Sequence, residues 1–157
     1  MPTHLSDEQA QFVEEIGLLM EEHGRTRIAG KILGWLLICE PPQQSFAALV
    51  DVLGASKGSI SSMTTLLLEA KLIERVAMPG DRQTYYQMAP DAWSLVLSRM
   101  AERIQRSVEA AEAGLALVER LHPEADHWRL REMRELNRIA AEGFPAFVEK
   151  FEASRRA

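Results

Sequence analysis

Residues 45–70 read Ser45-Phe-Ala-Ala-Leu-Val-Asp-Val-Leu-Gly54-Ala-Ser56-Lys-Gly-Ser-Ile-Ser-Ser-Met-Thr-Thr-Leu-Leu-Leu-Glu-Ala70, and this stretch decides the fold. Apolar side chains recur at helical spacing on either side of Gly54, so helices are predicted at about 46–53 and 57–70. Gly54 is a typical helix terminator, and Ser56 is a typical N-cap for the next helix. Because so short a turn forces the helices to cross steeply, the stretch predicts a helix-turn-helix whose second helix begins at the surface.

A short hairpin, or wing, is predicted directly after the second helix. Residues 72–76 and 83–88 have the β-branched and aromatic composition of strands, and residues 78–82 have the composition of a turn. A helix-turn-helix of this kind presents its second helix as DNA-binding proteins do when they place a helix in the major groove. The fold class expected is therefore mainly α, with a small wing of two or three strands.

Two helices are predicted before this unit. Ser6 and Gln9 form the pattern of a capping box at the start of the first helix. Residues 25–40 are apolar on most sides, which indicates a buried second helix that ends at a pair of prolines. Gly30 and Gly34 lie four residues apart on one face of it, so another helix is expected to pack closely there.

Two long helices are predicted after the wing, at about 92–121 and 125–153, and Pro145 is expected to kink the second. Both carry apolar residues near heptad spacing, and such seams need something to pack against. A second copy of the chain is the simplest partner, so a homodimer is expected. The domain organisation predicted is 1–40 for N-terminal dimerisation and core support, 41–90 for the winged helix-turn-helix, and 91–157 for C-terminal dimerisation.

The net charge of −5 is unevenly distributed. Residues 1–24 hold six acidic residues and no Lys or Arg, whereas residues 25–90 hold seven basic and five acidic residues. Residues 91–157 hold eleven basic and twelve acidic residues. Positive charge is thus concentrated in the region of the helix-turn-helix, but the excess is small. It predicts DNA binding through a few placed contacts and two-fold avidity rather than through a broad basic field.

Several classes of protein are not supported by this sequence. No apolar run approaches the length of a membrane span, and the first residues do not resemble a secretion signal. The single cysteine, Cys39, excludes an internal disulfide framework. No Ser/His/Asp or phosphate-loop pattern supports catalysis. We therefore expect a soluble, cytoplasmic protein that is not an enzyme and needs no cofactor, metal or membrane.

The start of the second helix of the helix-turn-helix carries the predicted DNA contacts. The helix N-terminus and Lys57 suit a phosphate, and Gly58 lets the backbone approach closely. The hydroxyl side chains can bond phosphates or base edges, but none makes the bidentate contact of an arginine with guanine, so DNA shape and water are expected to contribute. The residues expected to contact DNA from this helix are Ser56, Lys57, Gly58, Ser59, Ser61, Ser62 and Thr65.

The wing is predicted to add a second set of contacts. Arg82 at its tip is the candidate for insertion into the minor groove or for a phosphate contact, with Arg75 and Gln83 beside it. Asp81 opposes the phosphates unless it orients Arg82. A hairpin that is simply solvated is the alternative.

A further basic cluster lies at the start of the buried helix and comprises Arg25, Arg27 and Lys31. It is predicted either to contact phosphate or to balance the acidic first helix. The sequence leaves these two readings equal.

Taken together, these segments resemble a known family. Gly24-Arg25, Ile28-Ala-Gly-Lys-Ile-Leu-Gly-Trp-Leu-Leu-Ile38, Leu53-Gly-Ala-Ser-Lys-Gly-Ser-Ile-Ser61 and Leu68-Glu-Ala-Lys-Leu-Ile-Glu-Arg-Val76, then Pro-Gly-Asp-Arg82 and Tyr85-Tyr86, are similar to the GbsR branch of MarR-type winged-helix transcriptional regulators. The resemblance covers about residues 17–90. It implies a homodimer, held by N- and C-terminal helices, that binds a pseudo-palindromic operator in double-stranded DNA. It also implies repression that a small-molecule effector relieves. Lys31 stands where the family leads us to expect arginine.

Three other readings compete with parts of this one. A winged helix with so little positive charge also fits a protein-interaction module that does not bind specific DNA. Cys39 is a candidate thiol switch, but it follows an apolar run and has no nearby base, which favours a buried, inert thiol. His122 and His127 lie near acidic residues, but their spacing matches no established zinc pattern and favours a solvated loop.

Two tryptophans are candidates for an effector pocket. The family's effector pocket tends to lie where the dimer helices meet the winged helix, and Trp35 and Trp93 are expected near that junction. Aromatic faces there suit a cationic ligand such as a quaternary amine. Aromatic residues at helical spacing are more often part of the core.

Overall fold

The computed structural model describes residues 5–156, and its internal contacts divide the chain into two units. The N-terminal unit extends to Ala92, and the C-terminal unit begins at Trp93. The elements of the N-terminal unit are α1 (Asp7–Glu22), α2 (Arg27–Ile38), β1 (Gln44–Ser45), α3 (Phe46–Leu53), α4 (Lys57–Glu69), β2 (Ile73–Val76) and β3 (Tyr85–Met88). The C-terminal unit is formed by α5 (Ala92–Leu121) and α6 (Trp128–Arg156). The fold is therefore mainly α with a small sheet, as the sequence predicts.

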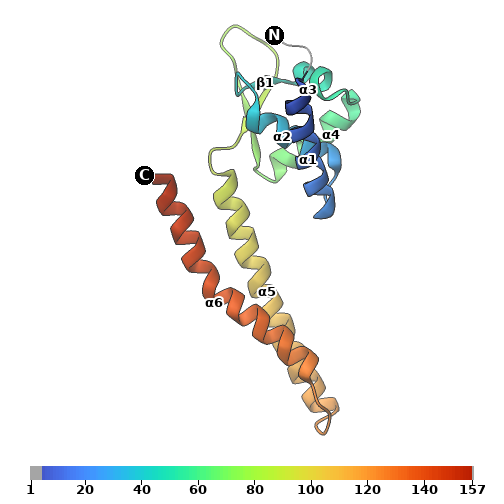
Figure 1. The fold of residues 1–157 in the computed structure, drawn as a ribbon, viewed down its shortest axis with the longest axis vertical. Helices are drawn as coiled ribbons and strands as arrows, with labels where there is room; N and C mark the ends of the chain where they lie inside the picture. The colour runs from blue at the N-terminus through green and yellow to red at the C-terminus, as the bar shows by residue number, and fades with distance from the viewer. Residues whose placement is uncertain (1–4, 157) are drawn as a thin grey trace. The chain divides into compact units, whose positions relative to one another are not determined.

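Helices α1 and α2 pack against one another through glycines (Figure 1). A Cβ atom on Gly30 would lie 2.7 Å from the Cα atom of Gly17 and 2.7 Å from the carbonyl oxygen of Ile16. The close approach expected at Gly30 is thus confirmed, and Gly17 is its counterpart on α1. The predicted capping box is also confirmed, because the Ser6 hydroxyl accepts from the Gln9 amide and the Gln9 side chain accepts from the Ser6 amide.

The helix-turn-helix lies between β1 and β2, close to its predicted limits. The Ser45 and Ser56 hydroxyls cap α3 and α4, at 3.1 Å from the amide nitrogens of Ala48 and Ser59. Gly54 ends α3 with a φ of 59°, a left-handed conformation that glycine adopts without strain. Beneath these helices lies a continuous core, which contains Val13, Ala29, Ile32, Leu33, Trp35, Leu36, Cys39, Leu49, Leu53, Ile60, Leu67, Ile73 and Tyr86.

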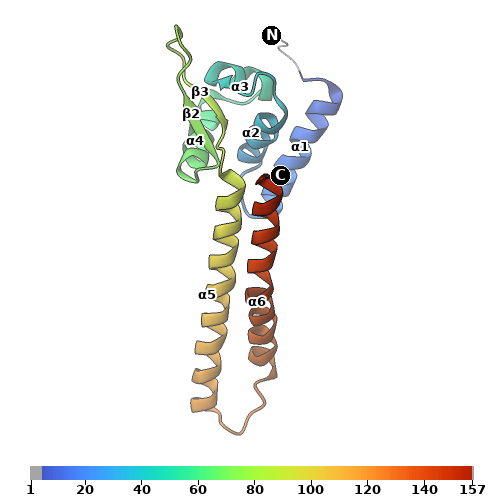
Figure 2. The same cartoon turned by 90° about the vertical axis from the view of Figure 1, so that its left-hand side faces the viewer.

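The sheet has three antiparallel strands in the order β1-β3-β2. Tyr85 pairs with Val76 on β2 and with Ser45 on β1, so the central strand is held from both sides where the wing begins. The two residues of β1 are too few to show the alternation that marks a strand in sequence. The loop between β2 and β3 extends away from the helices of the N-terminal unit (Figure 2).

Helices α5 and α6 form an antiparallel hairpin (Figure 1; Figure 2). Leu97, Ala111 and Leu115 of α5 are buried, whereas none of the described residues of α6 is buried. The single seam predicted for α6 divides into two stripes. Phe144 and Phe151 are half-buried, whereas Met133, Leu136, Ile139 and Phe147 are exposed on α6. Pro145 lies inside α6, which bends along its length in Figure 1.

Candidate nucleic-acid interface

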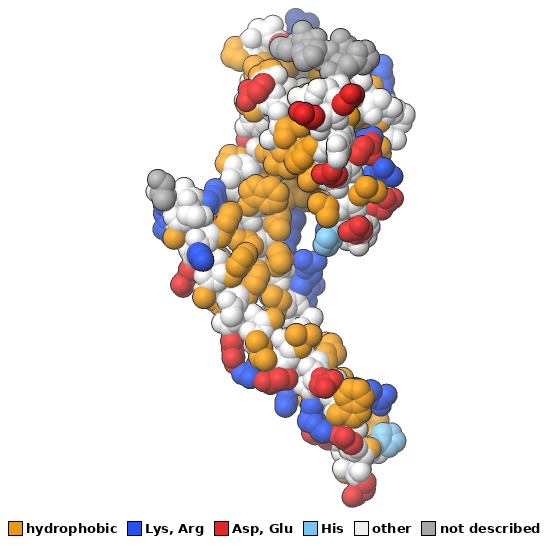
Figure 3. Space-filling model, in the orientation of Figure 1, with side chains coloured by type: hydrophobic (Ala, Val, Ile, Leu, Met, Phe, Trp, Pro, Cys, Tyr) orange, Lys and Arg blue, Asp and Glu red, His pale blue; other side chains and the backbone are white. Residues whose placement is uncertain are grey.

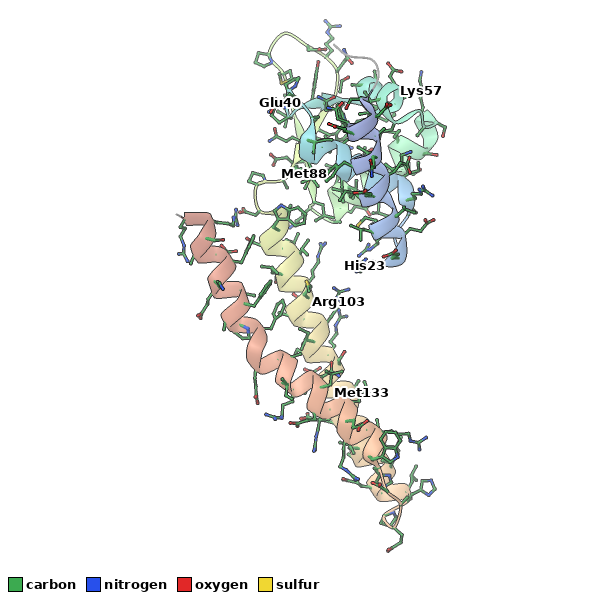
Figure 4. The ribbon with its side chains drawn as sticks, viewed as in Figure 1. His23, Glu40, Lys57, Met88, Arg103 and Met133 are labelled. Atoms are coloured by element: carbon green, nitrogen blue, oxygen red, sulfur yellow. The ribbon has the colours of Figure 1, made fainter. Side chains whose placement is uncertain are left out.

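The outward face of α4 presents the polar residues that the sequence predicts as DNA contacts. Ser56, Lys57, Gly58, Ser59, Ser61, Ser62 and Thr65 are all exposed, while Ile60, Thr64 and Leu67 face the core. Lys57 lies at the outer edge of the N-terminal unit (Figure 4). Because the buried positions recur at helical spacing, the polar residues share one accessible face.

Local hydrogen bonds occupy some of these hydroxyls and leave others available. The Ser56 hydroxyl donates to the Ser59 hydroxyl at 2.9 Å, and the Thr65 hydroxyl donates to the Ser61 carbonyl oxygen at 2.9 Å. Within residues 5–156, the side chains of Lys57, Ser61 and Ser62 form no hydrogen bond or ion pair. They are therefore the members of this face that are ready to meet an incoming phosphate or base edge.

A shallow hollow of about 500 Å³ lies beside the start of α4. Hydroxyl groups and one thioether line it, from Thr26, Ser56, Ser59, Ser62 and Met63, together with Ile28 and Gly58. A Cβ atom on Gly58 would meet only the Ser56 hydroxyl oxygen, at 4.0 Å. Because Gly58 has no side chain, a ligand can approach the backbone closely at the N-terminus of α4, where the helix dipole favours negative charge.

The wing tip is ordered by the carboxylate of Asp81. One oxygen accepts from the Gln83 amide at 2.9 Å, and the other accepts from the Tyr85 hydroxyl at 2.8 Å. These two bonds, the amide first, lower the pKa of Asp81 below its ordinary value. The sequence left open whether Asp81 orients the Arg82 side chain; the groups that its carboxylate bonds are the Gln83 amide and the Tyr85 hydroxyl. The Arg82 guanidinium is exposed and has no partner among the described residues.

The other two wing candidates differ in their surroundings. Gln83 is exposed beside Arg82, and its backbone is held by Asp81. Arg75 is exposed on β2 and lines a hollow that also contains Glu69, Glu74 and Lys71. Because two carboxylates and two cationic side chains share that hollow, it offers a phosphate no net positive charge.

The basic cluster at the start of α2 is largely engaged by α1. Glu14 accepts from the Arg27 guanidinium at 2.8 Å and from the Lys31 ammonium at 2.5 Å. These bonds, Lys31 first, lower the pKa of Glu14. Of the two readings that the sequence left equal, this geometry favours charge balance for Arg27 and Lys31. Arg25 is exposed and, among the described residues, has no such partner.

Comparison with known proteins decides the family. The chain is 38% identical over 126 residues to the HTH-type transcriptional regulator MmpR5 of Mycobacterium tuberculosis (strain ATCC 25618 / H37Rv), which covers 80% of this chain and 76% of that protein. The chain belongs to the MmpR5-like MarR family of transcriptional regulators. The model of that family matches residues 91–154, in the helical hairpin.

Two further similarities agree with membership of the MmpR5-like family. The putative HTH-type transcriptional regulator YvaV of Bacillus subtilis (strain 168) is 27% identical over 135 residues, which cover 76% of this chain and 73% of that protein. A crystal structure of a transcriptional regulator is 33% identical and has a TM-score of 0.71, with 93% of this chain and 99% of that chain covered. This member of the MarR family is thus a DNA-binding regulator, and its relatives are regulators rather than enzymes. Assignment to the GbsR branch stays a prediction.

The two tryptophans predicted for the effector pocket of this MarR-family protein lie in different units. Trp35 is buried in the core of the N-terminal unit, where its indole N–H donates to the Gln44 side chain at 3.1 Å. Gln44 in turn donates to the Pro41 carbonyl oxygen at 2.7 Å, so a buried polar pair is satisfied. Trp93 is 51% exposed on α5. A pocket that both residues share stays a prediction.

The remaining candidates in this MarR-family chain have local partners. His127 and the His122 carbonyl oxygen are 2.9 Å apart, and Asp126 forms an ion pair with Arg131. Among the described residues, no three His, Cys, Asp or Glu side chains are grouped as metal ligands. No helix within residues 5–156 has the length and apolar character needed to cross a bilayer.

Cys39 in this MarR-family protein is expected to be unreactive in the native state. Its thiol is buried, and burial raises its pKa to about 11, so it stays protonated at neutral pH. The negative charge of the neighbouring Glu40 contributes to this rise in the pKa. Native protein should react slowly with a thiol reagent and quickly after unfolding. Peroxide should have the same effect, if any, on operator binding by wild type and by Cys39→Ser. A peroxide response that is present in wild type and lost in Cys39→Ser would instead support the thiol switch.

Proposed function

We propose that this regulator is a homodimeric repressor that binds a pseudo-palindromic operator and releases it when a small molecule binds. Each subunit places the start of α4 in a major groove and the wing tip beside the adjacent minor groove. The observation that carries the proposal is the presence, in one unit, of an exposed polar face on α4 and of the exposed Arg82 guanidinium on the wing, which has no partner within residues 5–156. The proposed contacts are Ser56, Lys57, Gly58, Ser59, Ser61, Ser62, Thr65, Arg82, Gln83, Arg75 and Arg25.

Dimerisation is supported by the apolar surface of the helical hairpin. Leu136 of α6 is 69% exposed, and hydrophobic side chains gather over α5 and α6 in Figure 3. A groove of about 830 Å³ between the helices has a mainly apolar lining that includes Ile104, Phe144 and Val148. Monomeric proteins rarely expose continuous apolar surface of this kind, so a second subunit is the proposed cover.

The candidate residues for binding an effector are aromatic. Trp35 and Tyr85 line a partly open cavity of about 180 Å³ in the N-terminal unit, which Glu40 also lines. Trp93 offers an exposed indole face on the other unit. Aromatic faces near a carboxylate suit a small organic cation, which is the class of effector we propose.

The test is to select binding sites from sheared genomic DNA of the source organism and to sequence them. We expect an inverted repeat whose half-sites are separated by about one helical turn, roughly 10 base pairs or slightly more. Sedimentation should give two chains per duplex, and affinity should fall linearly on a log–log plot against salt because phosphate contacts release counterions. A reporter gene behind the recovered site should be repressed.

Other outcomes would contradict the proposal. Recovery of all genomic sequences equally, or of no DNA at all, would contradict sequence-specific DNA binding. Capture of a protein partner that does not weaken with salt would instead support the protein-interaction module. One chain per duplex would retain DNA binding and exclude the homodimer.

A further inference from the structure

The wing tip is a loop that few contacts hold in place. Between the end of β2 at Val76 and the start of β3 at Tyr85, a turn closes through the Asp81 amide, which donates to the Met78 carbonyl oxygen at 3.1 Å. Gly80 has a φ of 81°, which permits this turn. The side chain of Asp81 then connects the tip to Gln83 and to Tyr85. The Asp81 carboxylate is therefore the side-chain group that connects this turn to the returning strand.

Tyr85 joins this carboxylate to the rigid part of the domain. It belongs to the central strand, where it pairs with Val76 on one side and Ser45 on the other. Tyr85 is half-buried and lines the same cavity as Trp35. Its hydroxyl donates a hydrogen bond to the Asp81 carboxylate at 2.8 Å. The hydroxyl is thus the link through which the fixed sheet holds the projecting loop.

The ionisation states agree with this geometry. The bond raises the pKa of Tyr85 and contributes to the lowered pKa of Asp81. At neutral pH, Tyr85 therefore keeps its proton and Asp81 keeps its charge, which are the forms that the hydrogen bond needs. Hydrogen bonds to a charged acceptor are stronger than those between neutral groups.

Arg82 lies in the chain between Asp81 and Gln83, which are joined by a hydrogen bond from the Gln83 amide to the Asp81 carboxylate. The guanidinium has no partner among the described residues, so only the backbone of the tip sets its direction. Loss of the Tyr85 hydroxyl would leave the tip held by the Asp81–Gln83 bond and the Met78–Asp81 turn alone, without its link to the sheet, and would increase the conformational entropy that Arg82 loses on binding.

We propose that Tyr85 is a positioning residue for DNA recognition: its hydroxyl, through Asp81, holds the wing tip so that Arg82 meets the minor groove or its phosphates. This inference deepens the proposed function and rests on it. Tyr85 itself need not contact DNA. Its effect on binding should therefore depend entirely on the presence of Arg82.

The test measures operator affinity of the full-length protein in a double-mutant cycle of Tyr85→Phe and Arg82→Ala. Tyr85→Phe should weaken binding about five- to fiftyfold, because each of two wings loses a hydrogen bond worth a few-fold in affinity. In the Arg82→Ala background, the same change should have no further effect. Equal affinity of Tyr85→Phe and wild type, or effects that simply add, would overturn the proposal.

Two further variants separate positioning from stability. Tyr86→Phe is the matched control, because Tyr86 is buried on the opposite face of the same strand and is not a partner of Asp81; its affinity should equal that of wild type. Asp81→Asn should keep more affinity than Asp81→Ala, because an asparagine can accept from Gln83 and donate to the Tyr85 oxygen. Equal losses in the two Asp81 variants would overturn the proposed link.

A footprint locates the defect. Hydroxyl-radical cleavage of the Tyr85→Phe complex should lose protection at the wing positions and keep it where α4 binds. Uniform loss of protection would show a general loss of fold and would overturn the proposal. If the wild-type protein binds no operator, both the proposed function and this inference are wrong. If the wild type binds and Tyr85→Phe binds equally well, only this inference is wrong.

Discussion

Replacing Gly30 by alanine is expected to destabilise the N-terminal unit by about 2–3 kcal/mol. The added Cβ would lie 2.7 Å from two backbone atoms of α1, on Gly17 and Ile16, and 2.8 Å from the Met20 Cβ atom. Backbone atoms cannot rotate away, so the two helices must separate and lose buried contact. Alanine alone would favour a helix by roughly 1 kcal/mol over glycine, which is too little to offset this overlap. Thermal unfolding should show a midpoint lower by about 10–20 °C.

Two other glycines in the same unit provide controls for Gly30→Ala. A Cβ on Gly17 would meet the flexible Lys31 side chain at 3.0 Å, so Gly17→Ala should destabilise the unit less. Gly58 is open, with its nearest neighbour at 4.0 Å, so Gly58→Ala should unfold at the wild-type temperature or slightly above. Equal unfolding temperatures for Gly30→Ala and Gly58→Ala would show that the α1–α2 contact is not as tight as described.

Arg82→Ala is expected to weaken operator binding more than any other single change on the proposed interface. An arginine that meets a groove or phosphate contributes about 1–3 kcal/mol, and a dimer carries two copies, so the loss should reach roughly 2–6 kcal/mol. Dimerisation should change little, because Arg82 lies in the wing between β2 and β3, whereas the proposed dimer surface is on α5 and α6. The measurement is a titration of operator DNA at several salt concentrations, with sedimentation of the free protein.

Arg129→Ala is the matched control for Arg82→Ala, because it removes the same charge from an exposed position on α6. It should leave operator affinity close to that of wild type. The slope of affinity against salt should become shallower for Arg82→Ala if the guanidinium meets phosphate. Operator affinity that Arg82→Ala leaves unchanged at matched salt would show that the wing assignment is wrong.

Much of the fold was predictable because its signals are local. Ser45, Gly54 and Ser56 mark helix ends through hydrogen bonds and backbone angles within a few residues, and α3 lies at its predicted limits. The long helix at 92–121 was predicted equally well, from its apolar spacing. The predicted polar face of α4 is exposed for the same reason, since helical periodicity alone separates it from the core side.

Other features were hidden because they depend on residues far apart in the chain. The buried second helix was predicted to span 25–40, but α2 covers only Arg27–Ile38, because Thr26 caps its start and the chain is already extended at Cys39. Strand β1 was missed because only pairing with β3 defines it. Only the packing of α1 shows which of its faces is buried: Val13 and Gly17 are buried, whereas Leu19 is 50% exposed.

The sequence by itself determined a helix-turn-helix with a wing, flanked by helices, because capping, turn chemistry and helical periodicity act over a few residues. Only the tertiary structure decided how the charged side chains are used. Glu14 engages Arg27 and Lys31 across the α1–α2 contact, whereas Asp81 bonds to Gln83 and Tyr85 and Arg82 has no partner among the described residues. Such pairings depend on which groups the fold brings within about 3 Å of one another, and sequence patterns do not reveal that distance.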